Sequence, residues 1–226
     1  MVKLLLLHPL PLDGSIFSDD LPALADECMA PTLYEQGNDL IDWARAALDS
    51  VGDGPVVVVG NSVGGSCAIE VARLAPTKVK ALVLCGTKPG YRREPQLRDE
   101  ALDMLERHGL AAAWDRYWLP LFGPDASADV MEQGWLAAAK QGAERIACGV
   151  RAFHSRTDRE DFLGAWDGQV ALVSGEHDVA PERSRRLAER LRHGTHHLVA
   201  GVGHYLPLEA PDALRTITAE VLLTLH

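Results

Sequence analysis

Six short apolar segments recur along the chain and give the first indication of its fold. They span residues 2–7, 27–30, 55–59, 79–84, 170–173 and 197–200, and the second is the weakest. Several are continuous rather than alternating, which is the pattern of strands buried on both faces of a parallel sheet. The sequence therefore predicts a mostly parallel sheet of about six strands.

Apolar residues between these segments recur at helical spacing. Asn38 is a candidate N-cap for one helix, and Pro181 and Pro211 suit the first turns of two others. The apolar faces of the three helices are formed by Ile41, Ala44 and Leu48, by Leu187 and Leu191, and by Leu214, Ile217, Val221 and Leu222. Because strands and helices alternate, we expect an α/β fold with helices on both faces of the sheet.

The alternation stops between residues 88 and 163, which contain no convincing strand and are expected to form several short helices. This stretch holds three of the five tryptophans of the chain. We expect one domain over residues 1–226, with a core of residues 1–87 and 164–226 and a helical lid insertion at 88–163 that covers an apolar pocket. The alternative is a set of helices that only covers the edge of the sheet.

Composition and charge narrow the classes of function. The chain has 226 residues, of which 47% are hydrophobic and 24% charged, as is typical of one soluble globular domain. Its formal net charge of -10 would repel nucleic acid and an anionic membrane surface, so we expect neither as a partner. No apolar stretch approaches the roughly 20 residues of a membrane helix, and no signal-peptide layout is present. We therefore expect a cytoplasmic protein; its oligomeric state does not follow from the sequence.

Cysteine usage gives no indication of a metal site. The four cysteines, Cys28, Cys67, Cys85 and Cys148, lie far apart and form no C-x-x-C pair. This spacing argues against a zinc site or a disulfide framework. We expect free thiols, no metal and no other cofactor.

A predicted strand-to-helix turn carries a candidate nucleophile, Ser62. Residues 55–59 are followed by GNSVGG at 60–65, a G-x-S-x-G sequence that opens into a helical run. Such a turn forces its central residue into a strained backbone conformation, and the flanking glycines keep neighbouring side chains clear of it. The hydroxyl of Ser62 would then project above the sheet. The alternative is a tight glycine turn with an ordinary cap-forming serine.

Two later loops supply candidate partners for this serine. A serine nucleophile needs a base, and His204, in the loop after the last strand, is the one of nine histidines in a suitable loop. Asp178, just after residues 170–173, is the expected acid that orients the imidazole, and Glu176 in the same loop is the alternative. Because parallel strands end on one side of a sheet, we expect Ser62, Asp178 and His204 to meet there.

Four motifs together resemble the alpha/beta-hydrolase superfamily: LHPL at residues 7–10, GNSVGG at 60–65, GEHD at 175–178 and GHYLPLE at 203–209. The resemblance implies the alpha/beta-hydrolase fold, with a trimmed sheet and a structural role for His8. It also implies an oxyanion hole formed by the backbone N–H groups of Leu10 and Val63. The chain departs from the family at Pro9, where glycine is usual, and Pro11 offers no N–H.

The resemblance also favours a reaction class. It implies a serine hydrolase that cleaves a carboxylic ester or lactone through an acyl-enzyme, as small esterases and lactonases do. Enol-lactonase, thioesterase and carbon–carbon hydrolase activities are alternatives, and a non-catalytic receptor for a small ligand is a less favoured one. The carbon–carbon hydrolases commonly have tryptophan after the histidine, whereas this chain has Tyr205.

The aromatic residues of the insertion predict the character of the substrate. We expect a small-molecule substrate, compact and mostly apolar, because ligand pockets usually have apolar walls. The residues expected to line its pocket are Trp114, Trp118, Met131, Trp135, Phe153 and Tyr205. Alternatively, Arg92, Arg93 and Arg98 recognise a carboxylate on the substrate, although charged stretches of this kind are more often solvated.

Overall fold

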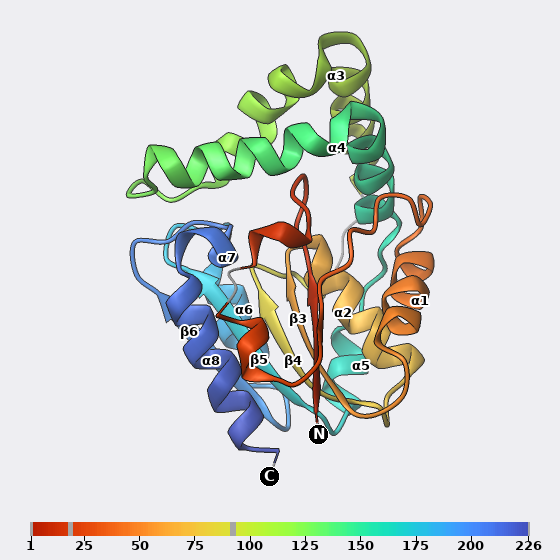
Figure 1. The fold of residues 1–226 in the computed structure, drawn as a ribbon, viewed down its shortest axis with the longest axis vertical. Helices are drawn as coiled ribbons and strands as arrows, with labels where there is room; N and C mark the ends of the chain where they lie inside the picture. Colours follow the sequence, from red (N-terminus) through yellow and green to blue (C-terminus); the bar gives the residue numbers. More distant parts are fainter. Residues whose placement is uncertain (1, 18–19, 91–93, 226) are drawn as a thin grey trace.

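A six-stranded parallel sheet in the order β2-β1-β3-β4-β5-β6 forms the centre of the computed structural model, which describes residues 2–17, 20–90 and 94–225 (Figure 1). The strands are β1 (Lys3–Leu7), β2 (Cys28–Met29), β3 (Val56–Asn61), β4 (Val79–Cys85), β5 (Gln169–Gly175) and β6 (Gly194–Val199). The predicted parallel sheet is therefore confirmed. The edge strand β6 begins at Gly194, ahead of its predicted start at residue 197. The prediction missed its first residues because they are only partly buried and carry no apolar run.

Helices cover both faces of this sheet, with α1 and α2 on one side and α8 on the other (Figure 1). Those outside the insertion are α1 (Leu40–Val51), α2 (Val63–Leu74), α6 (Pro181–Ala188), α7 (Leu206–Glu209) and α8 (Pro211–Leu223), with short 3-10 turns at Gly14–Ile16 and Pro22–Leu24. The starts predicted at Pro181 and Pro211 are confirmed. The cap predicted at Asn38 is wrong: Asp39 caps α1, because its carboxylate accepts the N–H of Ile41 at 2.8 Å.

Three of the four inner strands, β1, β3 and β4, explain the continuous apolar runs of the sequence. Every residue of β3 is buried, as are residues 4–7 of β1 and 81–85 of β4. A strand covered by helices on both faces has no solvent side on which polar residues are favoured. These strands fix the turns at their carboxyl ends, where the candidate site residues lie.

The segment between β4 and β5 is helical and lies above the carboxyl ends of the strands (Figure 1). It contains α3 (Pro95–Ala113), a π-helical turn at Trp114–Trp118, a 3-10 turn at Leu119–Leu121, α4 (Ala128–Ser155) and α5 (Glu160–Ala165). Instead of several short helices, the chain forms two long ones that are kinked at Gly109 (φ 80°) and Gly142 (φ 77°). Helix α5 runs across the boundary predicted at residue 163.

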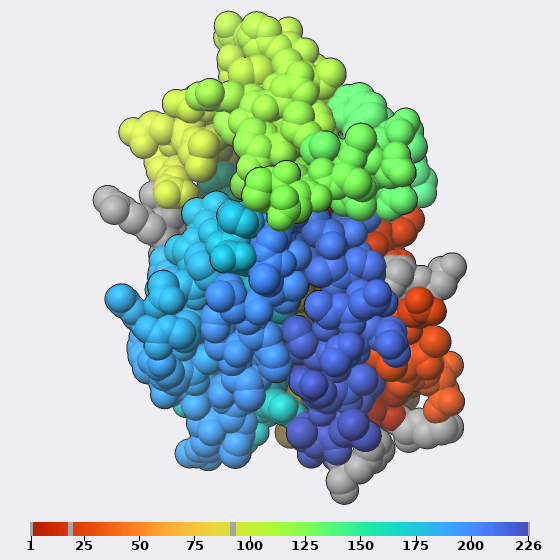
Figure 2. Space-filling view, turned by 90° about the vertical axis from the view of Figure 1, so that its left-hand side faces the viewer, coloured from red at the N-terminus to blue at the C-terminus, as the bar shows by residue number. Residues whose placement is uncertain are grey.

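The insertion is closed at its base and packs directly on the core. The N–H of Arg159, where the segment returns, donates to the carbonyl of Pro89, where it begins, at 3.0 Å. Figure 2 shows the insertion as a cap above the segments that follow β5 in the chain. In the part of the chain that the structure describes, no helix has the length and apolar character needed to cross a membrane.

Candidate active site

Ser62 occupies the turn between β3 and α2 in a conformation that few residues adopt. Its backbone angles are φ 56° and ψ -117°, and its N–H donates to the carbonyl of Cys85 at 2.8 Å. A side chain at Gly64 would collide with the carbonyl of Leu7, so this turn needs glycine beside it. The tight packing holds Ser62 at the end of the sheet in a strained state, as a nucleophile turn does.

His204 and Asp178 come together at the same edge of the sheet. Nδ1 of His204 lies 2.8 Å from Oδ1 of Asp178. Burial of Asp178 raises its pKa, but the hydrogen bond from His204 and the N–H of Val179 outweigh this and lower the pKa below its usual range. Glu176 instead accepts the N–H of Gly201 at 2.9 Å. The geometry therefore favours Asp178 over Glu176 as the partner of His204.

The amides proposed for the oxyanion hole lie on two different elements. The first hydrogen bond within α2 joins the N–H of Ser66 to the carbonyl of Ser62 at 3.0 Å, so the N–H of Val63 has no partner within the helix. Leu10 lies in the loop after β1, where its carbonyl accepts the hydroxyl of Tyr205 at 3.2 Å. The helix dipole of α2 also favours negative charge near Val63.

The buried ring of His8 holds the loop that follows β1. The ring is 1% exposed, and its Nε2 lies 3.1 Å from the N–H of Leu33, which donates to it. Its Nδ1 must therefore carry the proton, which it donates to the carbonyl of Pro9 at 3.2 Å. Burial lowers the pKa of His8 to about 4, so the ring is neutral at physiological pH. These contacts agree with the structural role expected for His8.

A cavity of about 450 Å³ opens above Ser62 and His204, and both line it. Leu10 also lies in its wall. The insertion contributes a largely apolar part of the wall, formed by Leu97, Tyr117, Trp118, Leu121, Val150 and Phe153. The volume suits a small organic molecule rather than a polymer.

Two of the six predicted pocket residues, Trp118 and Phe153, lie in this wall, and the other four do not. Trp114 packs against Trp135, with ring centroids 5.7 Å apart, and against Phe122. Tyr205 is fully buried and also packs against Phe122. The fourth, Met131, lies on α4, half-buried and outside the wall. For three of them the reason is packing with other aromatic side chains: Trp114 and Trp135 pack within the insertion, and Tyr205 packs against the insertion from the core.

The arginines considered for carboxylate recognition are not seen in the cavity wall. Arg92 and Arg93 lie outside the described residues. Arg98 forms an ion pair with Asp99 at 2.8 Å and lines a separate surface depression.

Comparison with known proteins agrees with this arrangement. The model of a family described as "Alpha/beta hydrolase family" matches residues 4–217. The chain belongs to this family. The match spans nearly the whole chain, including both strand-end loops and the insertion.

The proteins that this alpha/beta hydrolase resembles are named for different activities. The chain is 29% identical over 194 residues to "Putative 2-succinyl-6-hydroxy-2,4-cyclohexadiene-1-carboxylate synthase" of Bacillus subtilis. This match covers 75% of this chain and 66% of the Bacillus subtilis protein. An esterase from Thermogutta terrifontis superimposes with a TM-score of 0.89 and 22% identity, covering 100% of this chain and 91% of the esterase. MenH from S. aureus superimposes with a TM-score of 0.84 and 17% identity, covering 99% of this chain and 94% of MenH. The two structural likenesses show the fold alone.

Gly86 is a site residue of this hydrolase that sequence reasoning missed. It follows β4 with φ 55°, and a Cβ there would lie 2.8 Å from both Oδ2 of Asp178 and Nδ1 of His204. The absence of a side chain at Gly86 thus leaves the space that the His–Asp pair occupies. Its position after a buried strand was the available signal, but no motif marked it.

No metal site is apparent in residues 2–17, 20–90 and 94–225, since no three His, Cys, Asp or Glu side chains are placed to hold an ion. The four cysteines are free. Cys67 and Cys85 are fully buried, and burial raises the pKa of both thiols, so neither is poised as a nucleophile.

Proposed function

We propose that this chain is a serine hydrolase that cleaves a carboxylic ester or lactone through an acyl-enzyme on Ser62. One observation carries the proposal: Ser62, in its strained backbone conformation, lines the same cavity as His204. Nδ1 of this histidine lies 2.8 Å from Oδ1 of Asp178. Family membership alone would not be sufficient, because one fold serves many reactions.

In the proposed mechanism, His204 accepts the proton of Ser62 while Oγ attacks the substrate carbonyl. The negative charge that develops on the carbonyl oxygen is stabilised by the N–H groups of Val63 and Leu10. His204, as imidazolium stabilised by Asp178, then gives its proton to the leaving alcohol. Water attacks the acyl-enzyme by the same steps in reverse, and this second half releases the acid and restores Ser62.

The proposed substrate is a compact molecule whose body is mostly apolar. The apolar side chains that the insertion places in the wall support this, since they exclude water and strengthen the oxyanion contacts. Enol-lactones and thioesters would undergo the same two steps, so they belong to the same proposal as alternative substrates. Carbon–carbon cleavage is a weaker alternative.

A second candidate function is the synthase reaction named for the Bacillus subtilis relative. The observation in its favour is the match to that protein over 75% of this chain. A chain that carried out only this reaction would turn over no ester, lactone or thioester. A receptor without catalysis would turn over none of these substrates and would also give no fluorophosphonate adduct.

The proposal is tested by treating the protein with a fluorophosphonate and locating the adduct by mass spectrometry. We expect one adduct, on Ser62, and none in Ser62→Ala or in a His204→Gln variant over the same interval. Burst kinetics with an activated ester should then give about one equivalent of product per chain. An adduct elsewhere, or no reaction by a folded protein, would overturn the assignment of the nucleophile.

A further inference from the structure

Three cationic side chains line the cavity above Ser62, and they come from three different elements. Lys88 follows β4, Arg156 caps the carboxyl end of α4, and Arg183 lies on α6. Among the described residues of the wall, Glu94 is the one carboxylate. The wall thus carries an excess of positive charge beside an apolar surface.

Contacts with neighbouring side chains hold two of these cations in place. The guanidinium of Arg156 lies 3.3 Å from the centroid of the Phe153 ring, and its Nη1 donates to the Phe153 carbonyl at 2.8 Å. Arg183 pairs with Glu160 at 3.3 Å, but Glu160 also pairs with Arg190 at 3.1 Å. Because two arginines share this one carboxylate, the positive charge of Arg183 is only partly neutralised.

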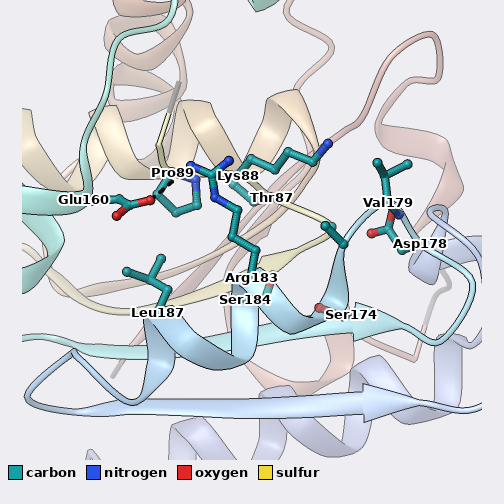
Figure 3. Close-up of a pocket in the computed structure, with 12 residues that line it drawn as sticks. Thr87, Lys88, Pro89, Glu160, Ser174, Asp178, Val179, Arg183, Ser184 and Leu187 are labelled. Atoms are coloured by element: carbon teal, nitrogen blue, oxygen red, sulfur yellow. Dashed lines mark hydrogen bonds and ion pairs between the residues drawn. The ribbon is translucent and has the colours of Figure 1, made fainter. Parts of the chain in front are cut away.

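The base of the insertion brings Arg183 beside Lys88. In Figure 3 the side chain of Arg183 rises from α6 toward Lys88 and Pro89, and Lys88 extends toward Val179 on the loop of Asp178. Gly90 permits this approach, since a Cβ there would collide with the guanidinium of Arg183. Two cations are therefore placed on the side of the cavity next to the His204–Asp178 pair.

This local charge contrasts with the rest of the molecule. The chain has a formal net charge of -10, yet its cavity wall carries three cations against one carboxylate in the part that is described. A cleft with low-dielectric walls concentrates the field of its charges, so this excess attracts an anion that the outer surface repels. An apolar substrate without charge would gain nothing from these groups.

We propose that Lys88, Arg156 and Arg183 bind a carboxylate on the substrate, so that the molecule cleaved is an acidic ester or lactone with an apolar body. The inference rests on the proposed function and deepens it. Arginine pairs with carboxylates through parallel hydrogen bonds, whereas Lys88 contributes a point charge. The carboxylate would orient the substrate, with the apolar wall around its body and the scissile carbonyl at Ser62.

The test compares two esters that differ only at the far end of the acyl chain. They are 4-nitrophenyl valerate, which is neutral, and the 4-nitrophenyl monoester of glutaric acid, which carries a carboxylate where valerate ends in methyl. We expect the wild type to prefer the anionic ester. Lys88→Gln and Arg183→Gln should each lower the anionic-to-neutral ratio of kcat/KM about tenfold, the size of one hydrogen bond to a charged group.

Two further variants separate recognition from a general defect. Arg186→Gln removes a positive charge from the same helix as Arg183 but outside the cavity wall, and it should leave the ratio unchanged. Glu160→Gln removes the carboxylate that pairs with Arg183, so it should raise the ratio. A folding defect would not change the ratio in opposite directions.

An unchanged ratio in Lys88→Gln and Arg183→Gln, or an equal loss in Arg186→Gln, overturns the carboxylate site but leaves the proposed hydrolase intact. Failure of the proposed function has another signature, namely no turnover of either ester and no fluorophosphonate adduct. In that event, calorimetric binding of the two esters to Ser62→Ala decides the carboxylate site independently: tighter binding of the anionic ester supports it, and equal affinity overturns it.

Discussion

Ser62 shows how one residue can be costly for stability and useful for chemistry. Only Ser62 and Ala180 combine a side chain with positive φ among the described residues. Such a conformation costs of order 1–3 kcal/mol, which the surrounding turn must offset. Ser62→Gly should therefore raise the free energy of unfolding by about 1 kcal/mol while abolishing the fluorophosphonate reaction. Ser62→Ala keeps a Cβ in the same strain, so denaturant unfolding should show no comparable gain; equal stability of the two variants would contradict this account.

Asp178 and Glu176 offer a matched pair of carboxylates in one loop. Only Asp178 contacts His204, at 2.8 Å, whereas Glu176 holds the N–H of Gly201. By analogy with measured triads, Asp178→Asn should lower kcat by up to about four orders of magnitude, because the imidazole loses the partner that fixes its tautomer. Glu176→Gln should change kcat by less than about threefold. Steady-state kinetics on an activated ester would reveal a wrong choice of acid as the reverse ranking.

Even a methyl group at position 86 should impair catalysis. In Gly86→Ala the new methyl group would contact Asp178 and His204 at distances of 2.8 Å, and φ 55° adds backbone strain. We expect kcat/KM to fall by at least about a hundredfold, since a displaced base loses its alignment. Gly164→Ala, on α5 with open space around it, is the control. Retained activity in Gly86→Ala would mean that the His–Asp pair moves freely at this point.

At the scale of elements, the kinked helix α4 is tied to the loop that carries Leu10. Nε2 of Gln141 donates to Oδ2 of the buried Asp13 at 2.6 Å, and the ammonium of Lys140 lies 3.4 Å from the same oxygen. Burial raises the pKa of Asp13, but hydrogen bonds from Ser15 and the charge of Lys140 lower it below normal. This link joins the insertion to the proposed oxyanion loop, just beside the kink at residue 142.

Gln141→Leu should break this link. A buried carboxylate that loses one donor costs about 1–3 kcal/mol, so we expect the free energy of unfolding to fall by that amount. We also expect kcat/KM to fall, because α4 then no longer restrains the loop of Leu10. The exposed Gln133 on the same helix gives the control, Gln133→Leu. Equal kcat/KM for the two variants would show that the link serves stability alone.

Elements with a strong local pattern were predictable from sequence, and those decided by tertiary contacts were not. Buried strands such as Val56–Asn61 appear as apolar runs, and the sharp turn at Ser62 requires glycines that can be read directly. The direction of a side chain on a helix covered by other helices cannot be read in this way. Trp118 lines the cavity and Trp114 packs against Trp135 inside the insertion, although they lie one helical turn apart. The cations of the cavity were missed because they come from three separate elements.

The whole molecule should lose stability steadily in acid. His8 is fully buried with a pKa of about 4, against about 6.5 when unfolded, so its contribution is complete above pH 6.5 and is lost as the pH falls toward 4. This amounts to about 3 kcal/mol. Asp13 and Asp178, whose pKa values are also lowered, extend the loss below about pH 4. Denaturant unfolding from pH 7 to 4 should show the decline.

His8→Gln removes the ionisable group and should flatten this decline, even though the variant starts from a lower stability. His108→Gln, an exposed position on α3, controls for the loss of an imidazole. A decline of equal slope in wild type and His8→Gln would show that other groups govern acid unfolding.

The hydrogen bond between Arg159 and Pro89 closes the insertion beneath its helices, and β4 and β5, which it connects, are neighbours in the sheet. The chain therefore leaves and re-enters the core at almost one place. Ser62, Asp178 and His204 all lie outside this segment, whereas much of the cavity wall lies within it. Evolution can consequently replace the segment as a unit and change substrate selectivity, while the reactive groups keep their alignment. A chimera that joins another segment at Pro89 and Arg159 should do the same in the laboratory.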